Sequence, residues 1–424
     1  MKKFHSLLLA LLMLISLTLS GCSSDKSPLN KKNPTTISIW HNYGGEMQTA
    51  MTMLIDTFNA TVGKEKGIIV RVDAVSSSSE LTKNLEMILD ETPGAPELPN
   101  IAISYPKTAI KFAEKNLLAD LTTYFTKDKI NLYVDEFIEE GKIGDALYVF
   151  PVAKSTEVLF VNQTLFDRFS AATGVKIENL STFEGICEVS VRYAQWCGKT
   201  FFTADSWFNL FSVAGQQMGD SFIKDGKLQT NSNTYKRLYS LLCDGVEKGG
   251  IRIYDGYSSD LSKTGEIVCS LGSTAGILYY GDSITYPDNT TEKVEYTILP
   301  YPTAEGGEKI AIQRGNGMMV KKATKAEEYA CAVFLEWLTQ PEQNIQFISN
   351  TGYLPVTKEA YNSIVFGKMP EVKNPNIAKL LAVAVEMHRD YKFYIPPVYD
   401  EFDTQSKEFE NNFKEKAGAL SPVK

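Results

Sequence analysis

Apolar and polar residues follow two alternating patterns along the first hundred residues of the chain. Residues 36–40 alternate like a half-buried strand, and apolar residues then recur every three or four positions over 46–59, as in an amphipathic helix. Residues 67–75 predict a second strand, 80–89 a helix and 100–104 a third strand. Strands that alternate with helices indicate an α/β fold on a mostly parallel sheet.

The alternation continues through the rest of the chain. We expect further helices over 109–115, 163–173, 183–196, 233–247, 326–338 and 379–387. We expect further strands over 146–151, 157–161, 266–271, 275–279, 296–299 and 317–320. A chain of 424 residues exceeds what one hydrophobic core usually serves, so two domains are predicted. No long linker separates them, so the chain should cross between two lobes several times.

The N-terminus has the order of a secretory signal. Lys2 and Lys3 precede an apolar run over 7–19, and small residues follow it. This run is shorter than the roughly 20 residues of a spanning helix, so residues 1–21 are predicted to be a signal peptide. Leu19-Ser20-Gly21-Cys22 resembles the bacterial lipobox, which implies a lipid on Cys22 and a tether over 22–35. The alternative is an ordinary cleaved signal with an incidental cysteine.

Charge and residue usage exclude several kinds of chemistry. A net charge of −8 argues against nucleic acid, which needs a basic footprint. Outside the signal only His41 and His388 remain, and neither a metal-ligand cluster nor a nucleotide-binding motif occurs. We therefore expect no metal, no cofactor and no enzymatic activity.

The cysteines leave one question open. Five follow Cys22, an odd number that does not suit a disulfide framework: Cys187, Cys197, Cys243, Cys269 and Cys331. Cys187 and Cys197 form a disulfide, or all five are buried small apolar residues, and the sequence favours neither.

Several blocks resemble, in order, the extracellular solute-binding proteins that serve sugar and glycerol-phosphate ABC importers. They lie at 39–45, 146–151, 158–163, 181–184 and 351–356. The resemblance implies a two-lobed, type II-like periplasmic-binding-protein fold with an interlobe ligand cleft. It places lobe 1 at 36–153 plus about 303–336 and lobe 2 at about 154–302 plus 337–424. Crossings are expected at 151–157, at 299–302 and near 326–338.

The function that this resemblance implies is transport. A monomeric lipoprotein, anchored outside the bacterial cell membrane through Cys22, captures a small hydroxyl-rich ligand by hinge closure and delivers it to ABC permease subunits. The alternatives are a secreted glycan-processing enzyme and a ligand sensor with the same cleft.

The blocks most resemble the glycerol-3-phosphate-binding branch of this family. Its ligand contacts map onto Tyr43, Glu80, Ser155, Trp207, Ser273, Gly317, Tyr353 and Arg389. The aromatic rings offer flat faces to a sugar or polyol, and Arg389 offers a charged fork to an anion. Trp207 lies among four phenylalanines, so core packing and ligand stacking remain equally open for it.

Two departures from this branch widen the choice of ligand. Residues 314–318 read Arg-Gly-Asn-Gly-Met instead of a glycine pair with a serine, and 394–397 replace an arginine motif. A neutral saccharide is therefore a rival to a phosphorylated polyol, with Arg314 as a candidate replacement for the missing arginine.

Overall fold

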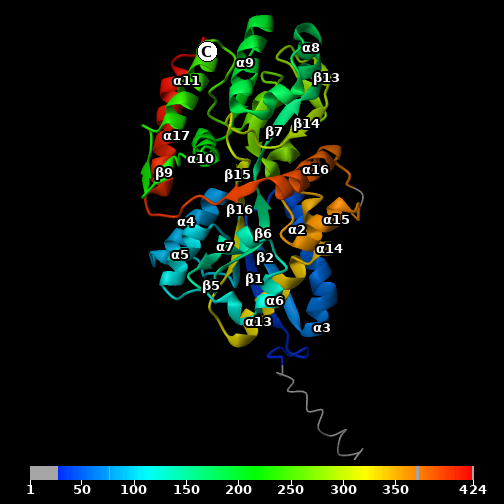
Figure 1. The fold of residues 1–424 in the computed structure, drawn as a ribbon. Helices are drawn as coiled ribbons and strands as arrows, with labels where there is room; N and C mark the ends of the chain where they lie inside the picture. The colour runs from blue at the N-terminus through cyan, green and yellow to red at the C-terminus, as the bar shows by residue number, and fades with distance from the viewer. Residues whose placement is uncertain (1–26, 76, 369–371, 423–424) are drawn as a thin grey trace, which may run out of the picture.

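The chain forms two α/β lobes, stacked one above the other in Figure 1. The structure is a computed structural model that describes residues 27–75, 77–368 and 372–422, so the predicted signal lies outside the described residues. Each lobe has its own sheet and its own hydrophobic core. The predicted two-lobed α/β fold is confirmed.

Lobe 1, the lower lobe in Figure 1, is built on a five-stranded sheet. The strand order is β2 (Ile68–Ala74), β1 (Thr35–His41), β3 (Ile101–Ser104), β16 (Arg314–Val320) and β6 (Val149–Ser155). β1 pairs in parallel with β2 and β3, whereas β16 is antiparallel to β3 and β6. Four of the five strands therefore run in the same direction, as expected for a mostly parallel sheet. β16 is the exception, because it enters from the cleft while its neighbours run towards it.

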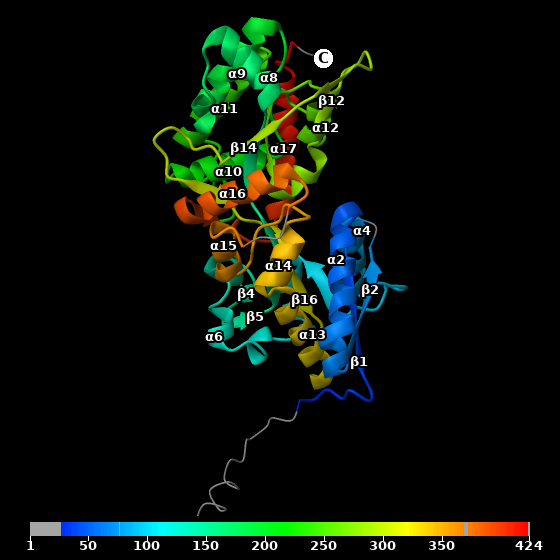
Figure 2. The same cartoon turned by 90° about the vertical axis from the view of Figure 1, so that its right-hand side faces the viewer.

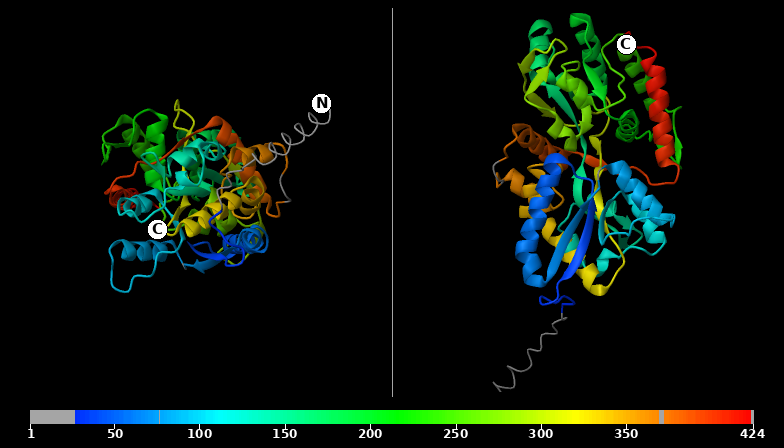
Figure 3. Two further views of the ribbon diagram at one scale, coloured as in Figure 1. Left: turned by 90° about the horizontal axis from the view of Figure 1, so that it is seen from below. Right: turned by 180° about the vertical axis from the view of Figure 1, so that it is seen from behind.

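Helices cover both faces of this sheet (Figures 1 and 3). On one side lie α2 (Gly45–Phe58), α13 (Lys325–Leu338) and α14 (Pro341–Ile348). On the other side lie α4 (Ser78–Leu89) and α5 (Pro106–Glu114). The smaller elements of this lobe are η1 (Asn59–Gly63), α3 (Lys64–Lys66), η2 (Leu121–Thr123), α6 (Lys127–Ile130), α7 (Asp135–Glu139), β4 (Lys142–Ile143) and β5 (Ala146–Leu147).

Lobe 2 is built on a four-stranded sheet. Its strand order is β14 (Tyr296–Leu299), β7 (Glu157–Asn162), β11 (Cys269–Ser273) and β8 (Phe202–Ala204). Its main helices are α8 (Gln163–Thr173), α9 (Phe183–Cys197), α10 (Trp207–Gln217), α11 (Asn233–Glu247) and α17 (Phe402–Gly418). Its smaller elements are η3 (Ile177–Ser181), β9 (Ile223–Lys224), β10 (Lys227–Leu228), α12 (Ser258–Lys263), η4 (Thr274–Tyr279), β12 (Ser283–Thr285) and β13 (Thr291–Lys293).

Local chemistry fixes where the helices begin and end. α13 begins with a capping box, in which the Thr324 hydroxyl accepts from the Glu327 backbone and the Glu327 carboxylate accepts from the Thr324 backbone. α9 begins at the Thr182 side chain and ends at Gly198, whose φ of 71° suits glycine. These caps satisfy backbone groups that would otherwise lack partners at the helix ends.

Three segments cross between the lobes (Figures 1 and 2). The first runs from β6 to β7 through Thr156, and the second runs from β15 (Ile310–Ile312) through Gln313 to β16. The third includes α16 (Pro375–Asp390), which lies between the lobes after α15 (Lys358–Val365). β17 (Lys392–Tyr394) then pairs with β15.

The second and third crossings lie later in the chain than we expected. Tyr301 is fully buried in the core of lobe 2, so the chain has not left that lobe at 299–302. Phe334 and Leu335 of α13 are fully buried in the core of lobe 1, so α13 is not a crossing. Residues 337–361, which we expected in lobe 2, supply Leu338, Phe347, Leu354, Val356 and Tyr361 to the lobe 1 core.

Candidate functional site

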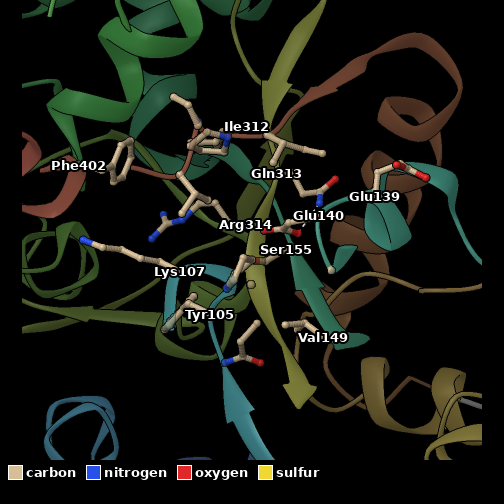
Figure 4. Close-up of a pocket in the computed structure, with 18 of the residues that line it drawn as sticks. Tyr105, Lys107, Glu139, Glu140, Val149, Ser155, Ile312, Gln313, Arg314 and Phe402 are labelled. Carbon is tan, nitrogen blue, oxygen red and sulfur yellow. Dashed lines mark hydrogen bonds between the residues drawn. The ribbon is translucent and has the colours of Figure 1, made fainter. Parts of the chain in front are cut away.

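A cavity of about 680 Å³ lies where the two lobes meet, beside the first two crossings. Lobe 1 contributes the start of α5, residues 139–143 and the adjoining parts of β6 and β16. Lobe 2 contributes residues from α10, the end of β11 and the start of α17, and residues 395–398 also line the space. Figure 4 shows side chains from both lobes around it.

Three of the predicted contact residues come together in this cavity. Ser155 ends β6, Ser273 ends β11, and Tyr353 lies in the loop after α14, yet all three line the same space. The loop is fixed to the first crossing, because the Leu354 N–H donates to the Lys154 carbonyl oxygen over 2.7 Å. The site therefore has hydroxyl groups from both lobes and from their junction.

Tyr43 lies behind Tyr353. Its ring centroid is 6.1 Å from that of Tyr353 and 5.5 Å from that of Phe347. Only 5% of Tyr43 is exposed, and burial raises the pKa of its hydroxyl well above the usual value. Tyr43 therefore supports the ring that faces the cavity.

Two predicted contact residues are packed inside the protein instead. Trp207 is fully buried, with its ring centroid 5.1 Å from that of Phe413, so core packing is the reading that its position supports. Gly317 lies within β16, where an added Cβ would be 2.5 Å from the Phe150 carbonyl oxygen. Glycine is needed there for close approach of the strands.

Glu80 and Arg389 lie away from the cavity. Glu80 is exposed in the first turn of α4 and does not line this space. Arg389 lies in the last turn of α16 with a side chain that is 72% exposed, and it pairs with its neighbour Asp390 over 2.6 Å. Cys22, the predicted lipid-attachment residue, lies outside the described residues.

Arg314 is held at the cavity wall by a buried carboxylate. Its Nη1 donates to Glu157 Oε1 over 2.7 Å, and Asn209 Nδ2 donates to the same oxygen over 2.7 Å. Glu157 is 1% exposed, so burial raises the pKa of its carboxyl while Arg314 opposes that shift. The guanidinium therefore presents fixed donors beside the cavity.

A second carboxylate, that of Glu140, joins the two crossings, and its side chain is 11% exposed. Glu140 accepts hydrogen bonds from Lys154 of the first crossing and from Gln313 of the second. Gln313 Nε2 also donates to the Glu136 carbonyl oxygen over 3.2 Å. Burial lowers the pKa of Lys154, and the Glu140 charge opposes this.

An ion pair connects the lobes at one side of the cavity. Lys107, in the first turn of α5, donates to Asp403 Oδ2 over 2.6 Å and to the Asp400 carbonyl oxygen over 3.2 Å. In Figure 4 Lys107 lies on the same side as Arg314 and Phe402, opposite Glu139. This contact requires the two lobes to lie in their present arrangement.

The charges around the cavity are balanced. Lys107, Lys142 and Arg314 line it, as do Glu139, Glu140 and Asp403. Each of these cations is paired with a carboxylate, and so is Lys154 beneath them. The site therefore offers no surplus positive charge to an anion.

Several lining residues were not predicted from the sequence. Lys107, Asn209, Gln313 and Asn316 were not singled out, because their neighbours come from distant parts of the chain. In the sequence, only the segment around Arg314 drew attention to this part of the site, because it departs from the family pattern. In a parallel or mixed sheet, polar residues at strand ends beside a cleft are the first candidates for ligand contacts.

Other features of the described residues bear on function. No group of three or more His, Cys, Asp or Glu residues in the described ranges is placed to hold a metal ion. None of the described helices combines the length and apolar character that crossing a membrane requires. All five described cysteines are free thiols, so Cys187 and Cys197 of α9 do not pair.

Two α/β lobes, three crossings and a cavity at their junction define a two-lobed binding protein of the periplasmic-binding-protein class. The sequence pattern of the bacterial extracellular solute-binding proteins matches residues 53–376. The chain belongs to this family.

Two relatives resemble the chain over most of its length. It is 25% identical over 379 residues to the arabinooligosaccharide-binding protein of Bacillus subtilis (strain 168), covering 86% of this chain and 82% of that protein. It is 24% identical over 372 residues to the sn-glycerol-3-phosphate-binding periplasmic protein UgpB of Shigella flexneri, covering 78% and 77%.

Solved structures share the fold. The cyclic alpha-maltosyl-1,6-maltose binding protein from Arthrobacter globiformis has a TM-score of 0.73 at 20% identity, covering 92% of this chain and 95% of that one. UgpB from Mycobacterium tuberculosis, in complex with glycerophosphocholine, has a TM-score of 0.70 at 15% identity with the same coverage.

Proposed function

We propose that this protein is the substrate-binding component of an ABC importer, and that it captures a carbohydrate-class ligand between its lobes and delivers it to the permease. The observation that supports this most is the cavity at the lobe junction, lined by Ser155, Ser273 and Tyr353. Family membership and the names of both relatives agree with it. Ligand contacts from two lobes favour their closed arrangement, which a permease recognises.

The ligand that the charges favour is a neutral saccharide. A phosphate group is favoured by a surplus of positive charge, as an unpaired arginine fork supplies. Here the cations at the cavity are already paired with carboxylates, and Arg389 lies elsewhere. Hydroxyl groups and a tyrosine ring suit a neutral sugar, which makes the glycerol-phosphate reading the less favoured of the two.

Retention at the membrane through lipid on Cys22 is part of this proposal. The described chain starts at the lower end of lobe 1, remote from lobe 2 (Figures 1 and 2). A tether at that end leaves the cavity and both lobes accessible to a permease. Stable anchoring takes two or more acyl chains, since one gives only marginal binding. We propose that the protein acts as a monomer.

The proposal also includes that the protein binds its ligand without catalysing a reaction on it. A glycosidase needs two carboxyl groups free to transfer protons or attack the sugar. In the cavity Glu139 is paired with Lys142, and Glu140 with Lys154. Hydrolysis of an oligosaccharide by the purified protein, lost in Glu140→Gln, would overturn this part of the proposal.

Thermal shift and calorimetry test the main proposal. The protein that begins after Cys22 is screened against arabino- and malto-oligosaccharides, glycerol 3-phosphate and glycerophosphodiesters. A ligand that binds only the native state raises the melting temperature. A neutral sugar hit weakened by Tyr353→Ala supports the proposal, and a phosphorylated hit overturns the choice of a neutral ligand. If none of these compounds binds, the carbohydrate-class assignment fails.

A further inference from the structure

Two amide side chains at the cavity contain buried oxygens without a hydrogen-bond partner. Gln313 and Asn316 both line the cavity and are 2% and 6% exposed. Gln313 Oε1 and Asn316 Oδ1 have no partner in the described part of the chain. A buried polar atom left in this state costs roughly 1–3 kcal/mol, so its presence beside a ligand cavity requires an explanation.

The surroundings of Gln313 determine which of its amide atoms is unpaired. Its other amide atom, Nε2, donates to the Glu140 carboxylate and to the Glu136 carbonyl oxygen. Both neighbours only accept hydrogen bonds, so the reverse orientation of the amide would place three oxygens together. The unpaired atom is therefore an acceptor, and only a donor satisfies it.

Asn316 is held by the backbone of β16. An irregularity in strand pairing lies between Asn316 and Gly317, and Asn316 is opposite Ala153 of β6. Both unpaired amides thus lie on or next to the second crossing, on either side of Arg314. Gln313 lies in the crossing itself and Asn316 within the strand that follows it, so both are next to a hinge between the lobes.

We propose that Gln313 and Asn316 are specificity residues, whose amide oxygens accept hydrogen bonds from ligand hydroxyl groups when the lobes close. This inference rests on the proposed function. A sugar hydroxyl supplies the missing donor and removes the cost of the unpaired oxygens. The oxygens of a fully ionised phosphate group supply no donor, so the same two residues discriminate against a phosphate group at this position.

The test uses Asn316→Leu, in which a side chain of similar shape has no polar atom. The melting temperature without ligand should stay unchanged or rise by about 1–2 °C, because an unpaired buried oxygen is removed. Affinity for the neutral oligosaccharide found in the screen, with arabinotriose and maltotriose as first probes, should fall roughly 3- to 10-fold. A purely structural asparagine would give a lower melting temperature instead.

Gln217→Met is the matched control. Gln217 is a buried amide of lobe 2 whose atoms are paired: Nε2 donates to the carbonyl oxygens of Pro302 and Ile310, and Oε1 accepts from Ala304. This variant should lower the melting temperature and leave the affinity of the folded protein unchanged. Gln313→Met should lower both, since it loses the bonds to Glu136 and Glu140 as well.

The outcomes separate this inference from the proposed function. If the wild type binds a neutral oligosaccharide and Asn316→Leu binds it equally well, the inference fails and the proposed function stands. If Asn316→Leu melts at a lower temperature, as Gln217→Met should, the inference also fails. If no oligosaccharide binds the wild type, the proposed function fails and the inference fails with it.

Discussion

Arg314 and Glu157 form an ion pair that joins the sheets of the two lobes. Arg314 begins β16 of lobe 1, Glu157 begins β7 of lobe 2, and the two side chains meet over 2.7 Å. Each strand follows directly from a crossing, so the pair connects the two hinges beside the cavity. Its partners are unequal: the Arg314 side chain is 36% exposed and that of Glu157 only 1%.

This inequality predicts different results for two substitutions of Glu157. In Glu157→Gln an amide oxygen still accepts from Arg314 and Asn209, and the cost of burying the charge disappears, so the free energy of unfolding should change by less than about 1 kcal/mol. Glu157→Ala removes the acceptor from both donors and should lower it by about 2–3 kcal/mol. Urea unfolding of both variants measures this. Equal losses would mean that the charge itself matters.

Gly315 gives a second prediction at the same hinge. Its φ is +91°, and an added Cβ would lie 2.4 Å from the Ala153 carbonyl oxygen. Gly315→Ala should therefore lower the free energy of unfolding by about 2–4 kcal/mol, through backbone strain and a clash with backbone atoms. Gly276→Ala is the control, because its Cβ would meet no atom within 4 Å, and its unfolding curve should match the wild type. A wild-type curve for Gly315→Ala would contradict the strain.

The helices and strands were predicted from the periodic spacing of apolar residues, which indicates which positions in a segment are buried. The predicted ranges 163–173 and 233–247 match α8 and α11. The apolar segment 275–279 forms the 3-10 helix η4 instead of a strand, because the Ser273 hydroxyl accepts from the Ala275 N–H and starts a turn. No helix was predicted at α17, because its segment is mostly polar. The helix buries only a narrow stripe of side chains, those of Phe409, Phe413 and Ala417.

The candidate site was harder to predict than the fold. Ser155, Ser273 and Tyr353 were predicted as ligand contacts from the family resemblance, and all three line the cavity. Gln313 and Lys107 depend on partners from other segments of the chain, at Glu140 and Asp403. One-dimensional patterns report on burial and local geometry, not on which distant side chain supplies the partner.

Trp207 provides a third prediction, which separates packing from ligand binding. It is fully buried in lobe 2, so Trp207→Ala should lower the free energy of unfolding by about 3–5 kcal/mol. The affinity of the remaining folded protein for an oligosaccharide should not change. Tyr353→Ala should show the opposite pattern, with weaker binding and a smaller loss of stability. Urea unfolding and calorimetry on both variants distinguish the two roles, and weaker binding in Trp207→Ala would restore a ligand role.

Asp220 gives a pH-dependent prediction. The Thr234 backbone N–H donates to Asp220 Oδ2 over 3.0 Å, and this bond lowers the pKa of the carboxyl below its usual value of 3.8. A lowered pKa stabilises the folded state above the unfolded value, and this stabilisation is lost as the pH falls through the folded value. Asp220→Asn should therefore lower the free energy of unfolding at pH 7 by up to about 1 kcal/mol.

The difference between Asp220→Asn and the wild type should shrink as the pH falls from 5 towards 3. Urea unfolding across this range measures it. Asp145→Asn is the control, because Asp145 is an exposed carboxylate in the turn after β4, and its difference from the wild type should stay near zero. A difference for Asp220→Asn that is constant with pH would contradict the assignment of the lowered pKa.

Lys107 and Asp403 supply the last prediction, on the equilibrium between lobe arrangements. Their side chains are 22% and 71% exposed, and such pairs contribute about 0.2–1 kcal/mol. Because the pair forms only when α5 and α17 approach, Lys107→Gln should shift the population away from the present arrangement by up to about five-fold. High salt should shift the wild type in the same direction, since it screens exposed charges.

Distances between spin labels measure this shift. The labels replace Met53 of lobe 1 and Tyr257 of lobe 2, which are 55% and 74% exposed. The half-buried Cys197 and Cys243 are replaced by serine so that they do not react. Lys248→Gln is the control, because Lys248 pairs with Asp244 within one lobe. If Lys107→Gln and Lys248→Gln give the same distance distribution, the ion pair does not influence the opening of the cleft.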